Sequence, residues 1–326
     1  MKLPRRQFLQ LAASAATLPA VPRLAWAQSY PTRPVRLIVP FAAAGPLDIL
    51  TRLMAQWLSD RLGQQFVVEN RTGAGGNIGT EAATKAMPDG YSFLVVGASN
   101  AINRSLYSKL NFDVVRDMVP VAGIMRGPNV LEVHPSVSAN TVSEFIAHAR
   151  ANPGKITMAS AGIGTNQHMS GELFKMLAGV DLVHVPYNRG VGTALTDLLG
   201  GQVQMMIDSI PSSIEYIKAG KLRALGVTSA TRLDILPGVP AVAEFVPGYE
   251  ANGLAGLMAP KHTRPEIIET LNREINAALG DPAIEARFAE LGAVPMPGSS
   301  ADFGTFFAQE TEKWAKVVKF SGAKPD

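Results

Sequence analysis

The chain has 326 residues, of which 47% are hydrophobic and 17% charged, with no cysteine and a formal net charge of +3. This composition is typical of a well-packed globular protein and excludes an intrinsically disordered one. Without cysteine, the chain has no disulfides, no thiol nucleophile and no cysteine-ligated metal.

Residues 1–27 have the features of an export signal. The segment has a basic start, a mildly apolar stretch over residues 8–21 and the A-x-A cleavage pattern Ala25–Ala27. Arg5 and Arg6 resemble the twin-arginine signal, and an ordinary secretory signal is the alternative. The segment holds four basic and no acidic residues, so cleavage after Ala27 changes the formal net charge from +3 to −1. We therefore expect a periplasmic protein that binds no nucleic acid.

Downstream of the signal, apolar runs alternate with helical patterns. Strands are expected at 36–41, 66–69, 91–96, 130–133, 156–160, 182–185, 203–207, 222–227 and 253–259. Helices are expected at about 50–62, before the turn at 87–90, and at 142–151, 167–178, 193–199 and 212–219. This alternation predicts an α/β fold with parallel sheets covered by helices on both faces.

The final third of the chain is mainly helical. One helix opens at Arg264–Glu266, a second is capped by Asp281 and runs to about Leu291, and a third is capped by Ser299 or Ser300. The apolar side of the last helix is expected to pack into a core, and it consists of Phe303, Phe307, Trp314 and Val318.

Two stretches, 35–54 and 156–174, share one pattern: an apolar run, a turn of small residues and an amphipathic helix. Small residues let a ligand approach the main chain, and the following helix directs free N–H groups and its positive dipole end at the turn. Each stretch is a candidate anion cradle. Two cradles in two halves of the chain suggest a cleft that grips a small acid from both sides.

Competing motifs are incomplete. The glycines that begin at Gly73 and Gly162 lack the third glycine of a dinucleotide site, and Gly97–Ala101 nearly matches the hydrolase elbow but ends in alanine. The five histidines show no H-x-x-x-H pair. We therefore expect no cofactor, no catalytic residue and no metal.

Motifs along almost the whole mature chain, including ENRTGAGGNIG, PDGYSFLVVG, AGKLRALGVTSATR and LPGVPAVAEFVPGYE, resemble those of the Bug-type extracytoplasmic receptors. These are the substrate-binding proteins of tripartite tricarboxylate transporters. The resemblance implies a two-domain periplasmic-binding-protein-like (type II) fold with crossing strands and a ligand cleft between the domains. Domain I is expected at 28–128 plus 252–326, and domain II at 129–251.

The resemblance also implies a ligand, a small carboxylate or amino acid held by loops that match the two cradles. The candidate ligand-binding residues are Phe41, Ala42, Ala43, Ala44, Gly45, Asp48, Ser99, Asn100, Ser160, Gly162, Gly164, Thr165, Asn166, His168, Tyr187 and Asp208. The chain departs from the family at Ala44, where a second glycine is frequent, at the loop 187–193, which lacks a usual proline, and at Ile207, where phenylalanine is common. The identity of the acid should therefore not be copied from a relative.

Several side chains have two interpretations. Asp48 caps its helix or binds a ligand amine, and His168 bonds locally or donates to the ligand. Asp208, a carboxylate at the end of an apolar strand, is structural or belongs to the site. Arg189 is a solvated loop charge or a carboxylate clamp.

The resulting prediction is a monomeric periplasmic receptor that closes on a small carboxylate and delivers it to membrane transporter subunits. It is not expected to be an enzyme. The alternatives are a sensory receptor of the same fold and, third, a hydrolase.

Overall fold

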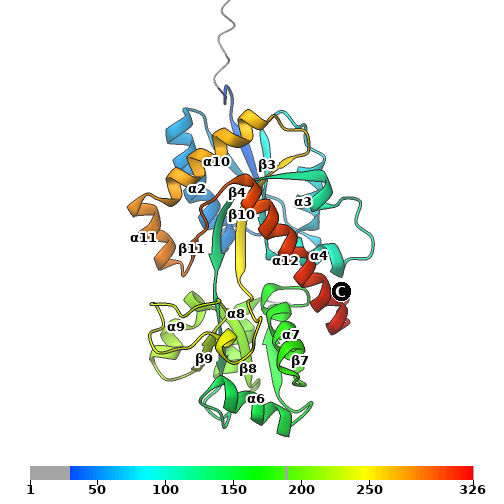
Figure 1. Ribbon diagram of the computed structural model, residues 1–326, viewed down its shortest axis with the longest axis vertical. Helices are drawn as coiled ribbons and strands as arrows, with labels where there is room; N and C mark the ends of the chain where they lie inside the picture. Colours follow the sequence, from blue (N-terminus) through cyan, green and yellow to red (C-terminus); the bar gives the residue numbers. More distant parts are fainter. Residues whose placement is uncertain (1–29, 188–189, 326) are drawn as a thin grey trace, which may run out of the picture.

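The computed structural model describes residues 30–187 and 190–325, which form two lobes connected by extended strands (Figure 1). The predicted signal peptide and Arg189 lie outside the described residues. The first lobe is built on a six-stranded sheet, here sheet A, and the second lobe on a five-stranded sheet, here sheet B.

Sheet A combines strands from both ends of the chain. Its spatial order is β11 (Val294–Pro295), β4 (Met118–Gly127), β10 (Gly253–Pro260), β3 (Ser92–Gly97), β1 (Val35–Val39) and β2 (Phe66–Asn70). The helices around it are α2 (Pro46–Leu62), α3 (Asn77–Thr84), α4 (Ala98–Leu106), α5 (Val114–Asp117), α10 (Pro265–Leu279), α11 (Pro282–Glu290) and α12 (Ser300–Ser321), with the 3₁₀ turn η1 (Ala74–Gly76).

Sheet B is formed from the middle of the chain. Its spatial order is β7 (Val183–Pro186), β6 (Thr157–Ser160), β8 (Met205–Ser209), β5 (Asn129–Val133) and β9 (Arg223–Val227). The helices around it are α6 (Val142–Ala151), α7 (Asn166–Ala178), α8 (Val191–Leu199) and α9 (Ile210–Lys218), with the 3₁₀ turn η2 (Val242–Glu244).

Both sheets are mixed, although the strand–helix alternation predicted parallel sheets. In sheet A, β1 to β4 share one direction, and β10 and β11 run against them. In sheet B only β5 is reversed. The reversals arise because β5 and β10 are entered directly from the crossing segments, without a helical crossover to restore the direction.

Most of the predicted helices are present in the structure because their ends carry capping residues. Asp281 accepts hydrogen bonds from Ala283 N and Ile284 N at the start of α11, and Ser299 accepts one from Asp302 N at the start of α12. The α12 residues expected in a core are indeed buried, with Trp314 0% exposed. Several elements were not predicted, among them β4, α4, α5 and β11. Pro120 and Gly123 break the strand pattern of β4, and α4 follows β3 without a turn.

α12 packs against both lobes. It contacts α4 in the first lobe and α7 in the second (Figure 1). Its Trp314 belongs to a buried apolar cluster that also holds Leu94 of β3 and Phe174 of α7. Because this cluster is continuous, the C-terminal helix holds the lobes side by side.

Candidate functional site

The carboxyl edges of the two sheets face each other. β4 ends at Gly127, and the chain passes directly into β5 at Asn129, which pairs with Ser209 at the carboxyl end of β8. Loops that follow β1, β2 and β3 therefore meet loops that follow β6, β7 and β8. In open α/β sheets, ligands bind outside the carboxyl ends of strands, so this junction is the candidate site.

The first loop, Phe41–Gly45, lies between β1 and α2 and is shaped by Asp48. Asp48 is 2% exposed and accepts hydrogen bonds from Ala44 N (2.9 Å), from the Arg52 guanidinium (2.9 and 3.1 Å) and from Asn70 Nδ2 (2.9 Å). Hydrogen bonds from Arg52 hold the pKa of this carboxyl below its ordinary value. Asp48 thus serves the protein's own loop, although it is not the helix cap: the N-cap of α2 is Gly45, and no side chain caps this helix.

Ala44 adopts a left-handed backbone, with φ of 62°. This conformation is costly for alanine and natural for glycine. The neighbouring Gly45 has φ of −76°, which any residue can adopt. The conformational need for glycine in this loop is therefore at position 44, which alanine occupies in this chain.

Another loop of the first lobe, residues 73–77 after β2, joins this site. The ring of Phe41 lies against Gly76 in the loop after β2, where a Cβ atom would come 3.2 Å from Phe41 Cζ, and close to Gly97 at the end of β3. Asn103 of α4 also donates to Gly75 O (2.8 Å). The loop 73–77 was missing from the candidate set, although its run of glycines after a strand was a usable signal.

Ser99 and Asn100 lie in the first turn of α4. Asn100 is buried, and its amide accepts from Gly97 N (2.8 Å) and donates to Thr80 Oγ1 (2.8 Å). Asn100 therefore fixes the start of α4 to α3, and the partly exposed Ser99 lies beside it.

The second loop, Ser160–Thr165, lies between β6 and α7 and is stabilised from within. Gly162 N donates to Ser160 Oγ (3.2 Å), Gly164 N to His168 Nδ1 (3.1 Å) and Thr165 N to Gly162 O (3.3 Å). Thr165 caps α7 by accepting from His168 N (3.3 Å). These four N–H groups are used inside the protein, which leaves the first turn of α7 as the source of donors.

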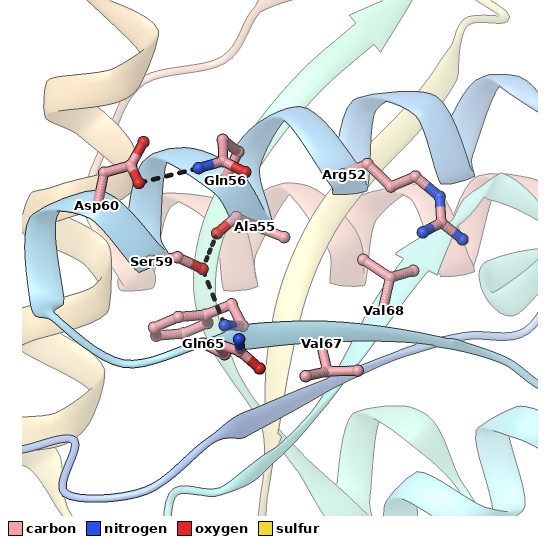
Figure 2. A pocket seen from close by; sticks show the side chains of 9 residues that line it. Arg52, Ala55, Gln56, Ser59, Asp60, Gln65, Val67 and Val68 are labelled. Atoms are coloured by element: carbon pink, nitrogen blue, oxygen red, sulfur yellow. Dashed lines mark hydrogen bonds between the residues drawn. The ribbon is translucent and has the colours of Figure 1, made fainter.

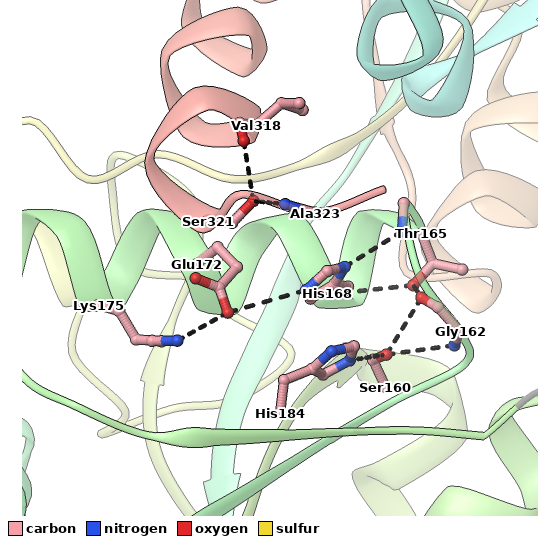
Figure 3. Close-up of polar contacts among 11 residues, drawn as sticks. Ser160, Gly162, Thr165, His168, Glu172, Lys175, His184, Val318, Ser321 and Ala323 are labelled. Carbon is pink, nitrogen blue, oxygen red and sulfur yellow. Dashed lines mark hydrogen bonds and ion pairs between the residues drawn. The ribbon is translucent and has the colours of Figure 1, made fainter. Parts of the chain in front are cut away.

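His168 is buried against the loop and stacks on His184, with 3.7 Å between the ring centroids (Figure 3). His168 Nε2 lies 3.8 Å from Glu172 Oε1, and His184 Nε2 is 2.6 Å from Ser160 Oγ. Burial lowers the pKa of His168 to about 3 and that of His184 to about 4, so both rings are neutral near pH 7. Of the two interpretations of His168, this geometry favours the local one.

Asp208 is the penultimate residue of β8 and is 0% exposed. Its Oδ1 accepts from Ser209 N (2.7 Å) and Gln167 Nε2 (3.5 Å), whereas its buried Oδ2 has no hydrogen-bond partner among the described residues. Burial raises the pKa of Asp208 to about 6. An unpaired buried oxygen is costly, which marks this residue as the strongest polar candidate in the second lobe.

A second buried acid lies near Asp208. Glu132 of β5 is 0% exposed, accepts from Ser213 Oγ (2.7 Å) and has an unpartnered Oε2. Burial, with the nearby Asp208, raises the pKa of Glu132 to about 8. The acid was detectable as a charge within the predicted strand 130–133, but its neighbour depends on the β5–β8 register.

Tyr187 follows β7 and packs against an apolar cluster that includes Ala159 and Leu195. Its hydroxyl donates to Asp197 Oδ2 (2.7 Å), and burial raises its pKa to about 12. The phenol is therefore protonated and is directed at α8.

The two lobes touch near the second loop. A Cβ atom at Gly164, whose φ is 77°, would overlap Leu106 Cδ2 at the end of α4. The lobes also touch at a second place: a Cβ atom at Gly292, which follows α11, would lie 2.9 Å from Pro211 Cγ of α9. Glycine at position 164 therefore allows close approach of the second loop to the first lobe.

A groove of about 560 Å³ lies elsewhere, between α2 and the edge strand β2. Its lining includes Gln56, Ser59 and Asp60 on one side and Gln65 and Val67 on the other (Figure 2). It is outside the junction of the two carboxyl edges and plays no part in the candidate site.

Across residues 30–187 and 190–325, no three acidic or histidine side chains are grouped so that they could hold a metal ion. No helix in this described part of the chain has the length and apolarity to cross a membrane.

Comparison with known proteins gives a consistent result. Residues 50–322 match the family described as tripartite tricarboxylate transporter family receptor. The protein BugT of Bordetella pertussis is 40% identical over 301 residues, covering 91% of this chain and 92% of that protein.

Solved structures agree. A protein from R. palustris determined with adipate is 38% identical, with a TM-score of 0.78 and coverage of 91% of this chain and 100% of that one. MatC from Rhodopseudomonas palustris with bound malate is 30% identical, with a TM-score of 0.74 and coverage of 89% and 100%. The chain therefore belongs to the tripartite tricarboxylate transporter receptors, a family of periplasmic solute-binding proteins.

Proposed function

We propose that this protein captures a small organic acid between two domains and presents it to the membrane subunits of a tripartite transporter. Domain I would comprise 28–128 plus 252–326, and domain II 129–251. The observation that carries the proposal is the pair of strand–loop–helix units, β1–α2 and β6–α7, placed at facing carboxyl edges. Relatives determined with adipate and malate support a carboxylate as the ligand.

The donors for the carboxylate would be main-chain N–H groups in the first turns of the two helices. These N–H groups have no hydrogen-bond acceptor within the helix, and the N-terminal end of a helix attracts anions. In α2 they belong to Leu47 and Asp48, and in α7 to Asn166 and Gln167. Gly162 and Gly164 would shape the second loop and admit the ligand, since their own N–H groups are bonded internally.

Asp208 would recognise a polar donor on the ligand. Its unpartnered Oδ2 can accept a hydrogen bond from an ammonium or hydroxyl group carried by the acid. A ligand with such a group would remove the cost of the unpaired oxygen.

Closure of the lobes would join two weak sites. An anion at one helix end gains about 0.3–1 kcal/mol when exposed and up to about 2 kcal/mol when partly buried. Neither end alone gives tight binding, so the ligand must contact both lobes and thereby favour the closed form. We further infer that the protein is exported by cleavage after Ala27, acts as a monomer and releases its ligand unchanged.

A thermal-shift screen of the mature protein tests this function. Adipate, malate, aspartate and citrate are compared with glucose and with sodium chloride at matched ionic strength. At 100 times Kd the ligand adds about 2.7 kcal/mol of stability, which raises Tm by several degrees at roughly 2–4 °C per kcal/mol. A shift with glucose alone and with no carboxylate refutes the proposal. Chemical conversion of the bound acid would instead indicate an enzyme.

A further inference from the structure

A ring of amide hydrogen bonds connects the start of α7 to both segments that cross between the lobes. Asn129 Nδ2, on the first crossing segment, donates to Asn166 Oδ1 (2.7 Å) and to Ala251 O (3.2 Å) on the second. Asn166 Nδ2 then donates to Asn252 O (3.3 Å). The two side-chain amides thus fasten three separate pieces of chain to one another.

The ring is anchored in the second lobe. Asn129 is 4% exposed, and its main chain exchanges hydrogen bonds with Thr228 after β9: Asn129 N donates to Thr228 Oγ1 (2.8 Å) and Thr228 N to Asn129 O (2.9 Å). Ala251 N also donates to Thr228 O (3.1 Å). The buried Asn129 amide would be left with a large desolvation cost if it lost such partners, so it holds the ring in place.

Immediately beyond the ring, toward the first lobe, two glycines face each other. Gly127 at the end of β4 pairs with Gly253 at the start of β10. A Cβ atom at Gly253 would lie 3.4 Å from Gly127 O. Glycine has more backbone freedom than any other residue, and hinges are a few element-terminal residues that absorb dihedral changes.

We propose that Asn129 and Asn166 are positioning residues for ligand capture, and that the lobes bend at Gly127 and Gly253. The amide ring makes the crossing segments, α7 and the second loop one rigid unit. When the chain bends at the glycine pair, this rigid unit moves as a whole and brings the first turn of α7 into contact with the ligand in a fixed orientation. This inference rests on the proposed function, because it assigns a role to residues that support the same site.

The matched variants are Asn166→Ala and Asn252→Ala. Asn166→Ala removes both bonds of that side chain, which is partly exposed, so the fold should persist. Asn252→Ala alters the same crossing segment, where its side chain contacts Glu250 and Thr228, but leaves its carbonyl available to Asn166. The control therefore disturbs the hinge region and keeps the ring.

Hydrogen exchange of the ligand-free protein is the first measurement. Asn166→Ala should raise the exchange rate of residues 160–168 at least tenfold, and Asn252→Ala should leave that segment near the wild-type rate. Equal exchange in both variants overturns the inference. This readout needs no ligand, so it decides the inference even if the wild type binds no carboxylate, which would refute the proposed function alone.

Calorimetry with the carboxylate that gives the largest thermal shift is the second measurement. Asn166→Ala and Asn129→Ala should each weaken its Kd by more than tenfold, and the double variant should be no weaker than the worse single variant. Such non-additivity is expected of residues in one network. If Asn129→Ala binds like the wild type, Asn166 acts by itself at the ligand, and the positioning role is wrong.

Discussion

Glu132 gives the most quantitative prediction from this structure. Its carboxyl is 0% exposed and its pKa is raised to about 8 from an ordinary value of 4.5, chiefly by burial. Between these values the folded protein holds a proton that the unfolded chain releases. Stability contributed by this group is therefore fully present below pH 4.5 and is lost as the pH rises toward 8.

The pH window for the measurement is set by the other groups whose pKa values are shifted. Asp208, with a pKa of about 6, changes stability in the same direction but at lower pH. The lowered pKa values of His168 and His184, about 3 and 4, make stability fall as the pH drops below about 6.5. From pH 6.5 to 8 the slope belongs mainly to Glu132, and at 1.36 kcal/mol per pH unit the loss is about 2 kcal/mol.

The substitution Glu132→Gln removes the titratable carboxyl group and keeps an oxygen that can accept a hydrogen bond from Ser213 Oγ. Urea unfolding of the wild type at pH 6.5 and 8 should show the loss of about 2 kcal/mol, and the variant should show almost none. Glu312→Gln, at an exposed position of α12, is the control and should behave as the wild type. Equal slopes for wild type and Glu132→Gln would refute the reasoning, because the acid would then be ionised in the folded state throughout.

Three further predictions concern the loops. Ala44→Gly should raise the free energy of unfolding by about 1 kcal/mol in urea titrations, because φ of 62° is strained for alanine; an unchanged or lower value would contradict this. Gly164→Ala should weaken carboxylate binding more than tenfold by calorimetry, since its Cβ would overlap Leu106. Adding Leu106→Ala should recover part of the lost affinity. Near-native affinity of the single variant would mean that the second loop takes no part in ligand binding. Asp208→Asn should weaken binding of aspartate relative to succinate by about 1.5–3 kcal/mol, whereas equal, small effects on the two ligands would mean that Asp208 is structural.

Local sequence signals determined most of the elements. Apolar spacing and capping residues such as Asp281 and Ser299 act within one or two turns, so the helices α2, α10, α11 and α12 and the buried face of α12 followed from the sequence. The two small-residue loops could be predicted from the sequence for the same reason, and the motifs that accompany them identified the family.

What the tertiary structure decided is everything that depends on which segments become neighbours. The sequence placed Asp208 at a strand end, but only the β5–β8 register brings it near Glu132. It gave no sign that Asn129 would meet Asn166, or that Gly127 would pair with Gly253. These partners are tens to more than a hundred residues apart, and a side chain's burial, charge state and hydrogen bonds depend on such long-range pairs, which no local propensity encodes.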